Sequence, residues 1–478
     1  MFSCYSTRAR LPLSRVTRPN SRTYSTKAAG SKNWNITGAF VVSLALGTGA
    51  TLWPRDKSKA PHLEATITQP LVAEKVLSRE AVTSLISQHA YSISTDSIPG
   101  VVKYDGAQVA SNQPCEDAFF HGQFPAPWQH NKQWMAWAVL DGHAGWQTSK
   151  LLETKLLPYV RERLTQLQDQ YGQGPAPTHV VQDAITQGFL NLDTSIMKAA
   201  EESAASDEPL QIKAGKLAPA FAGSCALLSL FDPATSTLHV ACTGDSRAVL
   251  GQQRPDGSWE AIPLSVDQTG RNAQEISRLQ KEHPGEDNIV KGGRVLGLMV
   301  SRAFGDSRWK WPLEVQQEMS RRYYGPAPLA PRYDVRTPPY LTAEPVVTST
   351  RIDYSRPTFL IMATDGLWDN MSSQQAVDVT GRWLEWRHGK EMPRQLRPAF
   401  ADLDFDFGDF GSKLEEGFVE ERETREDKNA AVHLVRNSLG GAHHELLAGR
   451  LAFRPPFSRN VRDDITVQVV VFQDHAAA

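Results

Sequence analysis

The stretch "WMAWAVLDGHAG", residues 134–145, decides the fold class and points to the chemistry. It begins with seven consecutive apolar residues, which is typical of a buried β-strand. The strand then gives way at once to Asp141 and to a glycine-containing turn. Because a strand holds its backbone rigidly, a carboxylate at its end can be presented in a fixed orientation. The stretch therefore predicts a buried sheet with an acidic residue placed for chemistry at its edge.

The same pattern recurs along the chain. Asp245 follows "LHVACTG", Asp365 follows "TFLIMAT", and Asp463 directly precedes "DITVQVVVF". One aspartate after a strand is usually a turn residue, but four of them in rich motifs favour a shared site. Four carboxylates that converge repel one another and need cations. Sites built only from oxygen ligands suit the hard ions Mg²⁺ and Mn²⁺.

The remaining patterns indicate a layered domain of helices and strands. Helical periodicity is clear in 146–167, with a stripe of Leu152, Leu156, Val160, Leu164 and Leu167, and again in 180–197. Apolar runs typical of strands lie at 134–140, 224–231, 238–243, 358–364 and 465–472.

The composition excludes some functions. A net charge of -2 gives no reason to expect a nucleic-acid partner. The four cysteines show no CxxC spacing, so neither a disulfide framework nor a zinc site is predicted. Cys225 and Cys242 are expected to be small core residues.

Six motifs carry a family resemblance. The chain resembles the metal-dependent Ser/Thr protein phosphatases of the type 2C group, in motif order and spacing, over nearly all of 94–473. The resemblance implies an α+β fold, a four-layer αββα sandwich of two antiparallel β-sheets flanked by helices. The motifs are "NQPCED" (112–117), "VLDGHAG" (139–145), "CTGDSRAVL" (242–250), "SRAFGD" (301–306), "ATDGLWD" (363–369) and "RDDITV" (462–467).

The resemblance also implies residue roles. Two Mg²⁺ or Mn²⁺ ions would activate a water that attacks phosphoserine in line. His143 matches the proposed general acid, which protonates the leaving serine oxygen. The alternative is that His143 has only a structural, hydrogen-bonding role. The implied metal ligands are Asp141 as the bridge, the carbonyl of Gly142, Asp365 and Asp463 at one ion, Glu116 and Asp117 at the second, largely through water, and Asp245 and Asp369 at a third, weaker site.

Two residues depart from most of the family. Asn112 stands where most members carry an arginine that grips the substrate phosphate, so phosphate binding must differ here and Asn112 is only a candidate for it. Asp464 stands where most members have asparagine. Both departures resemble the pyruvate dehydrogenase phosphatase branch of the family. A non-catalytic relative that only binds a partner is the alternative, but such proteins normally lose the metal carboxylates that this chain keeps.

The composition of the N-terminus is typical of a targeting sequence. No Asp or Glu precedes Asp56, and five arginines precede Lys27, which is typical of a mitochondrial transit peptide; we assign it to 1–31. Residues 33–54 are uncharged and bracketed by Trp34 and Trp53, which suggests a transmembrane segment anchoring the protein in the inner membrane. The sequence leaves both sides of the inner membrane, matrix and intermembrane space, open for the phosphatase domain. Residues 55–93 read as a linker, and 393–427 as an acidic surface insertion in the domain.

Four further stretches resemble the same pyruvate dehydrogenase phosphatase branch and carry few of the implied ligands. We therefore expect a phosphoprotein partner, the pyruvate dehydrogenase complex, with phosphoserine on its E1α subunit as substrate and reactivation of the complex as the result. A general mitochondrial Ser/Thr phosphatase with other substrates is the alternative. The stretches are 256–286, 293–311, 337–348 and 426–441.

Overall fold

The computed structural model describes residues 77–128, 132–172, 174, 176–387, 389 and 410–473. All of them belong to the second of two compact units, Ile67–Ala478. The predicted transit peptide (1–31) and transmembrane segment (33–54) lie outside the described residues. Within the described ranges, no helix has both the length and the apolar character needed to cross a membrane.

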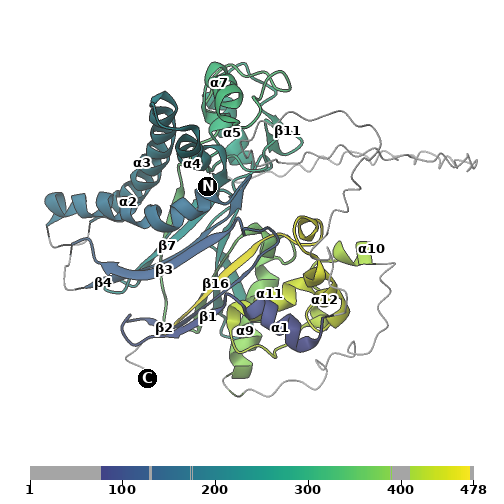
Figure 1. Ribbon diagram of the computed structural model, residues 1–478. Coiled ribbons are helices and arrows are strands. Elements are labelled where there is room, and N and C mark those ends of the chain that lie inside the picture. Colours follow the sequence, from purple (N-terminus) through teal and green to yellow (C-terminus); the bar gives the residue numbers. More distant parts are fainter. Residues whose placement is uncertain are drawn as a thin grey trace, which may run out of the picture. The chain divides into compact units, whose positions relative to one another are not determined.

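Two antiparallel sheets form the centre of this unit (Figure 1). One has six strands in the order β1 (Tyr91–Ser94), β2 (Val101–Val109), β16 (Ile465–Phe472), β15 (Thr358–Ala363), β9 (Arg247–Gln253) and β10 (Trp259–Pro263). The other has five strands in the order β14 (Val346–Arg351), β8 (Thr237–Thr243), β7 (Ala226–Asp232), β4 (Gln133–Leu140) and β3 (Ala118–Pro125).

The sheets pack face to face, which explains the apolar runs. On β4, Met135, Trp137 and Val139 point into a core shared with Leu360 and Met362 of β15. The alternating residues of β4 face the opposite way, into a second core formed with helices. Because side chains alternate across a strand, a strand covered on both faces must be apolar at every position.

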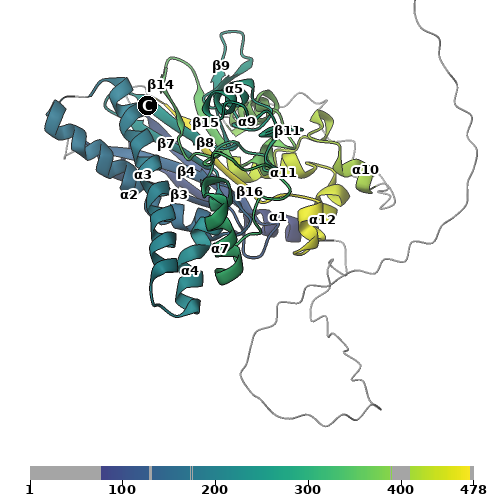
Figure 2. The same cartoon turned by 90° about the horizontal axis from the view of Figure 1, so that it is seen from above.

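Helices cover the outer face of each sheet (Figures 1 and 2). α2 (Gln147–Tyr171), α3 (Thr178–Ala205) and α4 (Leu210–Phe221) pack on the five-stranded sheet. α1 (Arg79–Ser87), α9 (Ser373–Arg387), α11 (Ala430–Leu439) and α12 (His444–Ala452) pack on the six-stranded sheet. The predicted αββα sandwich is therefore confirmed. The predicted helices 146–167 and 180–197 are α2 and α3, and Leu152, Leu156, Val160 and Leu164 are completely buried.

The folded region begins earlier than the sequence analysis placed it. α1 and all but the last residue of β1 lie within 55–93, which was read as a linker. Val82 and Ile86 of α1 are completely buried against the six-stranded sheet, and β1 pairs with β2. The C-terminal part of the predicted surface insertion at 393–427 contains helical structure. It forms α10 (Phe410–Leu414) and η3 (Glu420–Arg422), and Phe410 stacks on Phe453.

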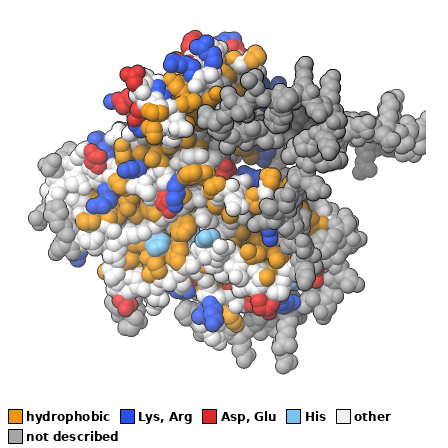
Figure 3. Space-filling model, in the orientation of Figure 1, with side chains coloured by type: hydrophobic (Ala, Val, Ile, Leu, Met, Phe, Trp, Pro, Cys, Tyr) orange, Lys and Arg blue, Asp and Glu red, His pale blue; other side chains and the backbone are white. Residues whose placement is uncertain are grey.

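The segment between β10 and β14 forms a subdomain with its own small core, built around Leu279, Val295 and Leu341. At the top of the view in Figure 3, where α7 lies, Lys and Arg side chains lie among Asp and Glu side chains. The subdomain contains α5 (Ala273–Glu282), β11 (Val290–Lys291), β12 (Arg294–Val295), β13 (Phe304–Gly305), α6 (Ser307–Lys310) and α7 (Leu313–Tyr323).

A short three-stranded sheet ties this subdomain to the sandwich. β13 pairs with β6 (Gly223–Ser224), and β6 pairs with β5 (Gly142–His143). The pairing brings the end of the motif at 301–306 against the motif at 139–145, although about 160 residues separate them in the sequence.

Candidate active site

Three of the predicted aspartates come together where strands of both sheets end. Asp141 follows β4, Asp245 follows β8 after one glycine, and Asp365 opens α8 (Asp365–Trp368) directly after β15. One carboxylate oxygen from each lies within 4.8 Å of the others. Burial and then the charge of Asp365 raise the pKa of Asp141 well above its usual range, and they raise the pKa of Asp245 to about 7. Such a cluster carries a large electrostatic cost that a bound cation would remove.

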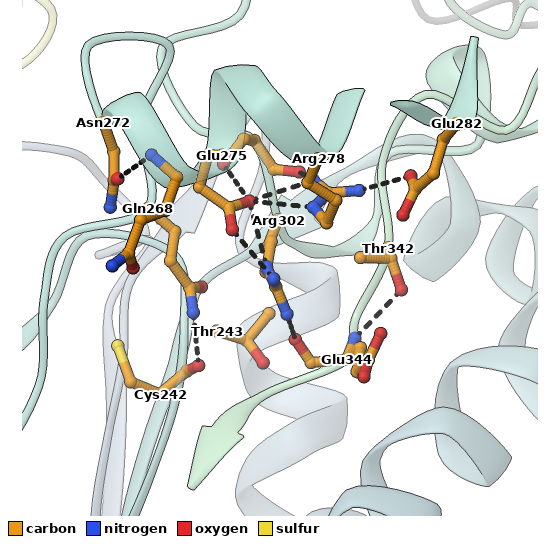
Figure 4. Close-up of polar contacts among 12 residues, drawn as sticks. Cys242, Thr243, Gln268, Asn272, Glu275, Arg278, Glu282, Arg302, Thr342 and Glu344 are labelled. Carbon is orange, nitrogen blue, oxygen red and sulfur yellow. Dashed lines mark hydrogen bonds and ion pairs between the residues drawn. The ribbon is translucent and has the colours of Figure 1, made fainter. Parts of the chain in front are cut away.

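The turn that presents Asp245 is held from two sides. Gln268 accepts a hydrogen bond from the backbone N–H of Gly244 at 2.7 Å and donates one to the carbonyl of Cys242 at 3.0 Å (Figure 4). Gly244 has φ +105°, and a Cβ there would lie 2.3 Å from the Sγ of Cys225. Only glycine fits this turn. Cys225 is buried as predicted, and its Sγ also lies 3.3 Å from Asp245 Oδ1.

The first motif packs directly against Gly142. A Cβ on Gly142 would lie 2.1 Å from the carbonyl oxygen of Glu116, so the two segments touch through backbone. Asp117 is buried and accepts hydrogen bonds from the hydroxyls of Thr364 (2.9 Å) and Thr466 (2.8 Å). Burial raises the pKa of both Glu116 and Asp117. The structure thus places the Asp117 carboxyl and the backbone of Glu116 beside the strand ends that carry the three-aspartate cluster.

Asp369 and Asp463 lie at the edge of this cluster. Asp369 is one turn after Asp365, and its pKa is raised by partial burial and by the charge of Asp365. Gly366, the residue after Asp365, packs against Asp463, because a Cβ on Gly366 would lie 3.1 Å from the Cβ of Asp463. The carboxylate of Asp463, however, forms an ion pair with Arg459. Among the described residues, the close carboxylate group therefore contains Asp245 and does not contain Asp463.

The two residues that depart from the family pattern contact each other. The side-chain amide of Asn112 donates to Asp464 Oδ2 at 3.1 Å and to Glu116 Oε2 at 3.2 Å. Asp464 also accepts from the backbone N–H groups of Ser111, Asn112 (3.0 Å) and Glu116 (2.9 Å). Burial opposes the charge of Asp464, but these donors outweigh it and lower its pKa. An anionic Asp464 therefore organises the first motif.

His143 pairs with Asp306, a residue that the sequence analysis did not single out. His143 Nε2 lies 2.6 Å from Asp306 Oδ2, and Asp306 is buried. Burial alone would lower the pKa of His143, but the charge and hydrogen bond of Asp306 outweigh it and raise that pKa. The pairing with Asp306 thus favours the imidazolium form of His143, which can give up a proton. The signal for Asp306 was the acidic last residue of the motif at 301–306.

A buried ion-pair network fixes the start of that motif (Figure 4). Glu275 of α5 accepts two hydrogen bonds from Arg302, at 2.8 and 3.0 Å, and two from Arg278, at 2.9 and 3.2 Å. The hydroxyl of Ser301 donates to the same carboxylate at 2.7 Å. Arg302 also donates to the carbonyl of Glu344 at 2.8 Å, which joins α5 to the segment entering β14. The network anchors the segment that ends at Asp306.

Comparisons with known proteins agree with this site. The family model "Protein phosphatase 2C" matches residues 106–401. "Protein phosphatase 2C homolog C10F6.17c" of Schizosaccharomyces pombe is 42% identical over 78% of this chain and 81% of its own length. "[Pyruvate dehydrogenase [acetyl-transferring]]-phosphatase 1, mitochondrial" is 36% identical in Saccharomyces cerevisiae, over 78% of this chain and 69% of that protein, and 31% identical in Homo sapiens, over 82% and 83%.

Among solved structures, a serine-threonine phosphatase 2C from Toxoplasma gondii aligns with a TM-score of 0.46 at 19% identity, covering 80% of this chain and 99% of that one. The match of the family model and the 42% identity to a relative covered over 81% of its length show that this chain belongs to the protein phosphatase 2C family of Ser/Thr phosphatases.

Proposed function

We propose that this chain is a mitochondrial, metal-dependent phosphatase that hydrolyses phosphoserine on the E1α subunit of pyruvate dehydrogenase and so reactivates the complex. The observation that carries the catalytic part is the group of Asp141, Asp245 and Asp365, with the His143–Asp306 pair on the adjoining short sheet. The substrate part is supported by the mitochondrial pyruvate dehydrogenase phosphatases among the relatives.

The donor set fits Mg²⁺ or Mn²⁺. All the side chains involved are carboxylates, and burial makes their negative charge costly without a cation. Bound there, the metals would supply positive charge for the phosphoryl oxygens and acidify a water. We assign the ions, two with a possible third, to the cluster and its neighbours: Asp141, Asp245 and Asp365, the carbonyl of Gly142, and Glu116, Asp117, Asp369 and Asp463.

The protein's own groups complete the chemistry. His143 is the general acid, because a serine alkoxide is a poor leaving group and needs a proton as the P–O bond breaks. Asp306 holds the imidazolium in place and stabilises its charge. Asp464, through the backbone of the first motif, keeps Glu116 and Asp117 beside Gly142.

The mitochondrial location is supported by the N-terminal composition and by the relatives with mitochondrial names. We assign residues 1–31 to import and residues 33–54 to an inner-membrane anchor. N-terminal sequencing of the protein from purified mitochondria should begin near residue 24 or later, and alkaline extraction should leave the protein in the membrane fraction. A sequence beginning at Met1, or a fully extracted protein, would contradict the respective assignment.

The substrate test uses purified pyruvate dehydrogenase complex phosphorylated on E1α. The chain with Mn²⁺ should release its phosphate and restore complex activity, and excess chelator should stop the release. Asp141→Asn is the matched inactive variant, with a loss of about a thousandfold or more, about 4 kcal/mol of barrier. Release from unrelated phosphoproteins at the same rate would favour a general mitochondrial phosphatase, and activity that survives chelation would exclude the metal mechanism.

A further inference from the structure

An arginine side chain lies at the rim of the carboxylate site. Arg459 belongs to η4 (Phe457–Asn460), and 45% of its side chain is exposed. Its guanidinium pairs with Asp463, the only partner that the described residues give it. Asp463 packs against Gly366, the residue after Asp365, because a Cβ on Gly366 would lie 3.1 Å from the Cβ of Asp463. The Arg459 guanidinium therefore lies at the edge of the carboxylate cluster.

The backbone that carries Arg459 is fixed beside the first motif. The hydroxyl of Ser458, which is completely buried, donates to the carbonyl of Ser111. The backbone N–H of Ser458 donates to Arg454 at 3.1 Å, and that of Arg462 donates to Ser458 at 3.0 Å. The residue before Arg459 thus contacts the residue before position 112, where most of the family carries its phosphate-binding arginine, although the two segments are far apart in the sequence.

Asn112 itself is poorly placed to bind a phosphate. Its amide nitrogen already donates to two carboxylates, those of Glu116 and Asp464. A phosphate oxygen would have to displace one of them and would then lie close to both negative charges. The Arg459 guanidinium has five N–H donors in a planar fork, which matches the geometry of two phosphate oxygens.

We propose that Arg459 binds the phosphoryl group of the substrate and takes the part that Asn112 cannot take. Asp463 holds the guanidinium at the rim of the site in the absence of substrate. Its hold weakens when the carboxylate shares its charge with a bound cation, and Arg459 is then available to a phosphate dianion. This inference rests on the proposed phosphatase function of the site, but it does not depend on which protein is the substrate.

The test compares Arg459→Ala and Arg459→Lys with the wild type at saturating Mn²⁺. Arg351→Ala is the matched control, because Arg351 is exposed and pairs with Thr237 at the opposite end of β8 from Asp245. The readouts are kcat and KM for an aryl phosphate, the inhibition constant of inorganic phosphate, and the dissociation constant of Mn²⁺ from calorimetry. The phosphate inhibition constant reports phosphate binding and the Mn²⁺ dissociation constant reports metal binding, so the two effects can be told apart.

Arg459→Ala should raise both KM and the inhibition constant of phosphate about 10- to 100-fold, as expected for one charge-assisted bidentate contact. The change in kcat should be smaller, because the contact holds phosphate before and during the reaction. Arg459→Lys should fall between the wild type and Arg459→Ala, because lysine keeps the charge but loses the fork. Mn²⁺ should bind as tightly or more tightly, since a competing cation is gone.

The proposal is wrong if the phosphate inhibition constant of Arg459→Ala stays within about twofold of the wild type, the scatter expected of a residue outside the site. It is equally wrong if only Mn²⁺ affinity changes, which would make Arg459 a counter-ion for the carboxylates. A wild type without metal-dependent hydrolysis would instead refute the proposed function. Calorimetric phosphate affinity of the Mn²⁺-loaded proteins would still decide the role of Arg459.

Discussion

At the residue scale, Asp464 shows how a buried charge depends on the donors around it. Its carboxylate is buried and negatively charged, so it must be surrounded by donors. The backbone N–H groups of Ser111, Asn112 and Glu116 supply three of them, and the Ser111 hydroxyl and the Asn112 side-chain amide supply two more. The two residues that depart from the family pattern, Asn112 and Asp464, therefore form one hydrogen-bonded unit.

The role of His143 can be tested through the leaving group. His143→Gln should lower kcat for a phosphoserine peptide by about 100-fold or more, because the alkoxide then leaves without a proton. An aryl phosphate should lose much less, because its phenolate leaves without help. Steady-state kinetics on the two substrates with the same enzyme preparations would measure the difference.

Asp306→Asn provides the companion variant. It keeps a hydrogen-bonding side chain beside His143 but removes the charge that stabilises the imidazolium, so it should reproduce part of the selective loss on phosphoserine. Equal losses on both substrates for His143→Gln would contradict acid catalysis and leave His143 with a structural role.

Sequence reasoning found the three aspartates that cluster, but not the contacts around them. Asp141, Asp245 and Asp365 could be found because each follows an apolar strand, and strand ends place carboxylates in fixed positions. The partners of His143 and Asp463 could not be found in this way. Asp306 reaches His143 only through the pairing of two-residue strands, and Arg459 reaches Asp463 from a single 3₁₀ turn. Such short elements have no periodicity to detect.

At the element scale, burial decided which strands and helices were predictable. β4, β15 and β16 are covered on both faces and are mostly apolar, so their limits were predicted within a residue or two. α1 is short and buries only Val82 and Ile86, and β1 is a four-residue edge strand with half-exposed side chains. Their stability comes from packing on the sheet, which no local pattern records.

The Glu275 network predicts a large effect from a small change. Glu275→Gln keeps the shape of the side chain but leaves Arg302 and Arg278 without the carboxylate between them. Removing one partner of a buried ion pair costs about 3 kcal/mol or more. We expect a loss of that size in the free energy of unfolding from urea denaturation.

The control for this variant is Glu282→Gln. Glu282 accepts from the same Arg278 at 2.7 Å, but it lies at the surface. Its loss should cost less than about 1 kcal/mol, because water screens an exposed pair. Similar losses for the two variants would mean that the network in Figure 4 does not anchor the motif at 301–306.

At the scale of the whole molecule, the site belongs to neither sheet alone. The five-stranded sheet supplies Asp141 and Asp245, and the six-stranded sheet supplies Asp365. The carboxylates meet only when the two sheets pack face to face, so the apolar core between the sheets also sets the geometry of the site. Substitutions deep in that core should therefore affect activity as well as stability.

Two buried histidines predict how the stability of the whole domain responds to acid. His433 of α11 lies against the carbonyl of Val379 and the amide of Asn437, and burial lowers its pKa to about 3. Burial also lowers the pKa of His239 to about 4. In both cases the folded pKa lies below the unfolded value of about 6.5, so the unfolded chain binds the extra proton.

The stability that these neutral imidazoles contribute is therefore complete above about pH 6.5 and is lost as the pH falls toward the folded values. Each should cost about 2 kcal/mol of unfolding free energy between pH 7 and pH 5. His433→Gln removes one titrating group, so its urea denaturation curves should show a pH dependence weaker by that amount, whatever its stability at pH 7. His239→Gln should do the same independently, because His239 lies on the helix-covered face of the five-stranded sheet and His433 lies in a helix that covers the six-stranded sheet. If either variant keeps the full wild-type dependence, that histidine is already protonated in the folded domain, and the burial of its imidazole does not have the energetic cost assigned to it.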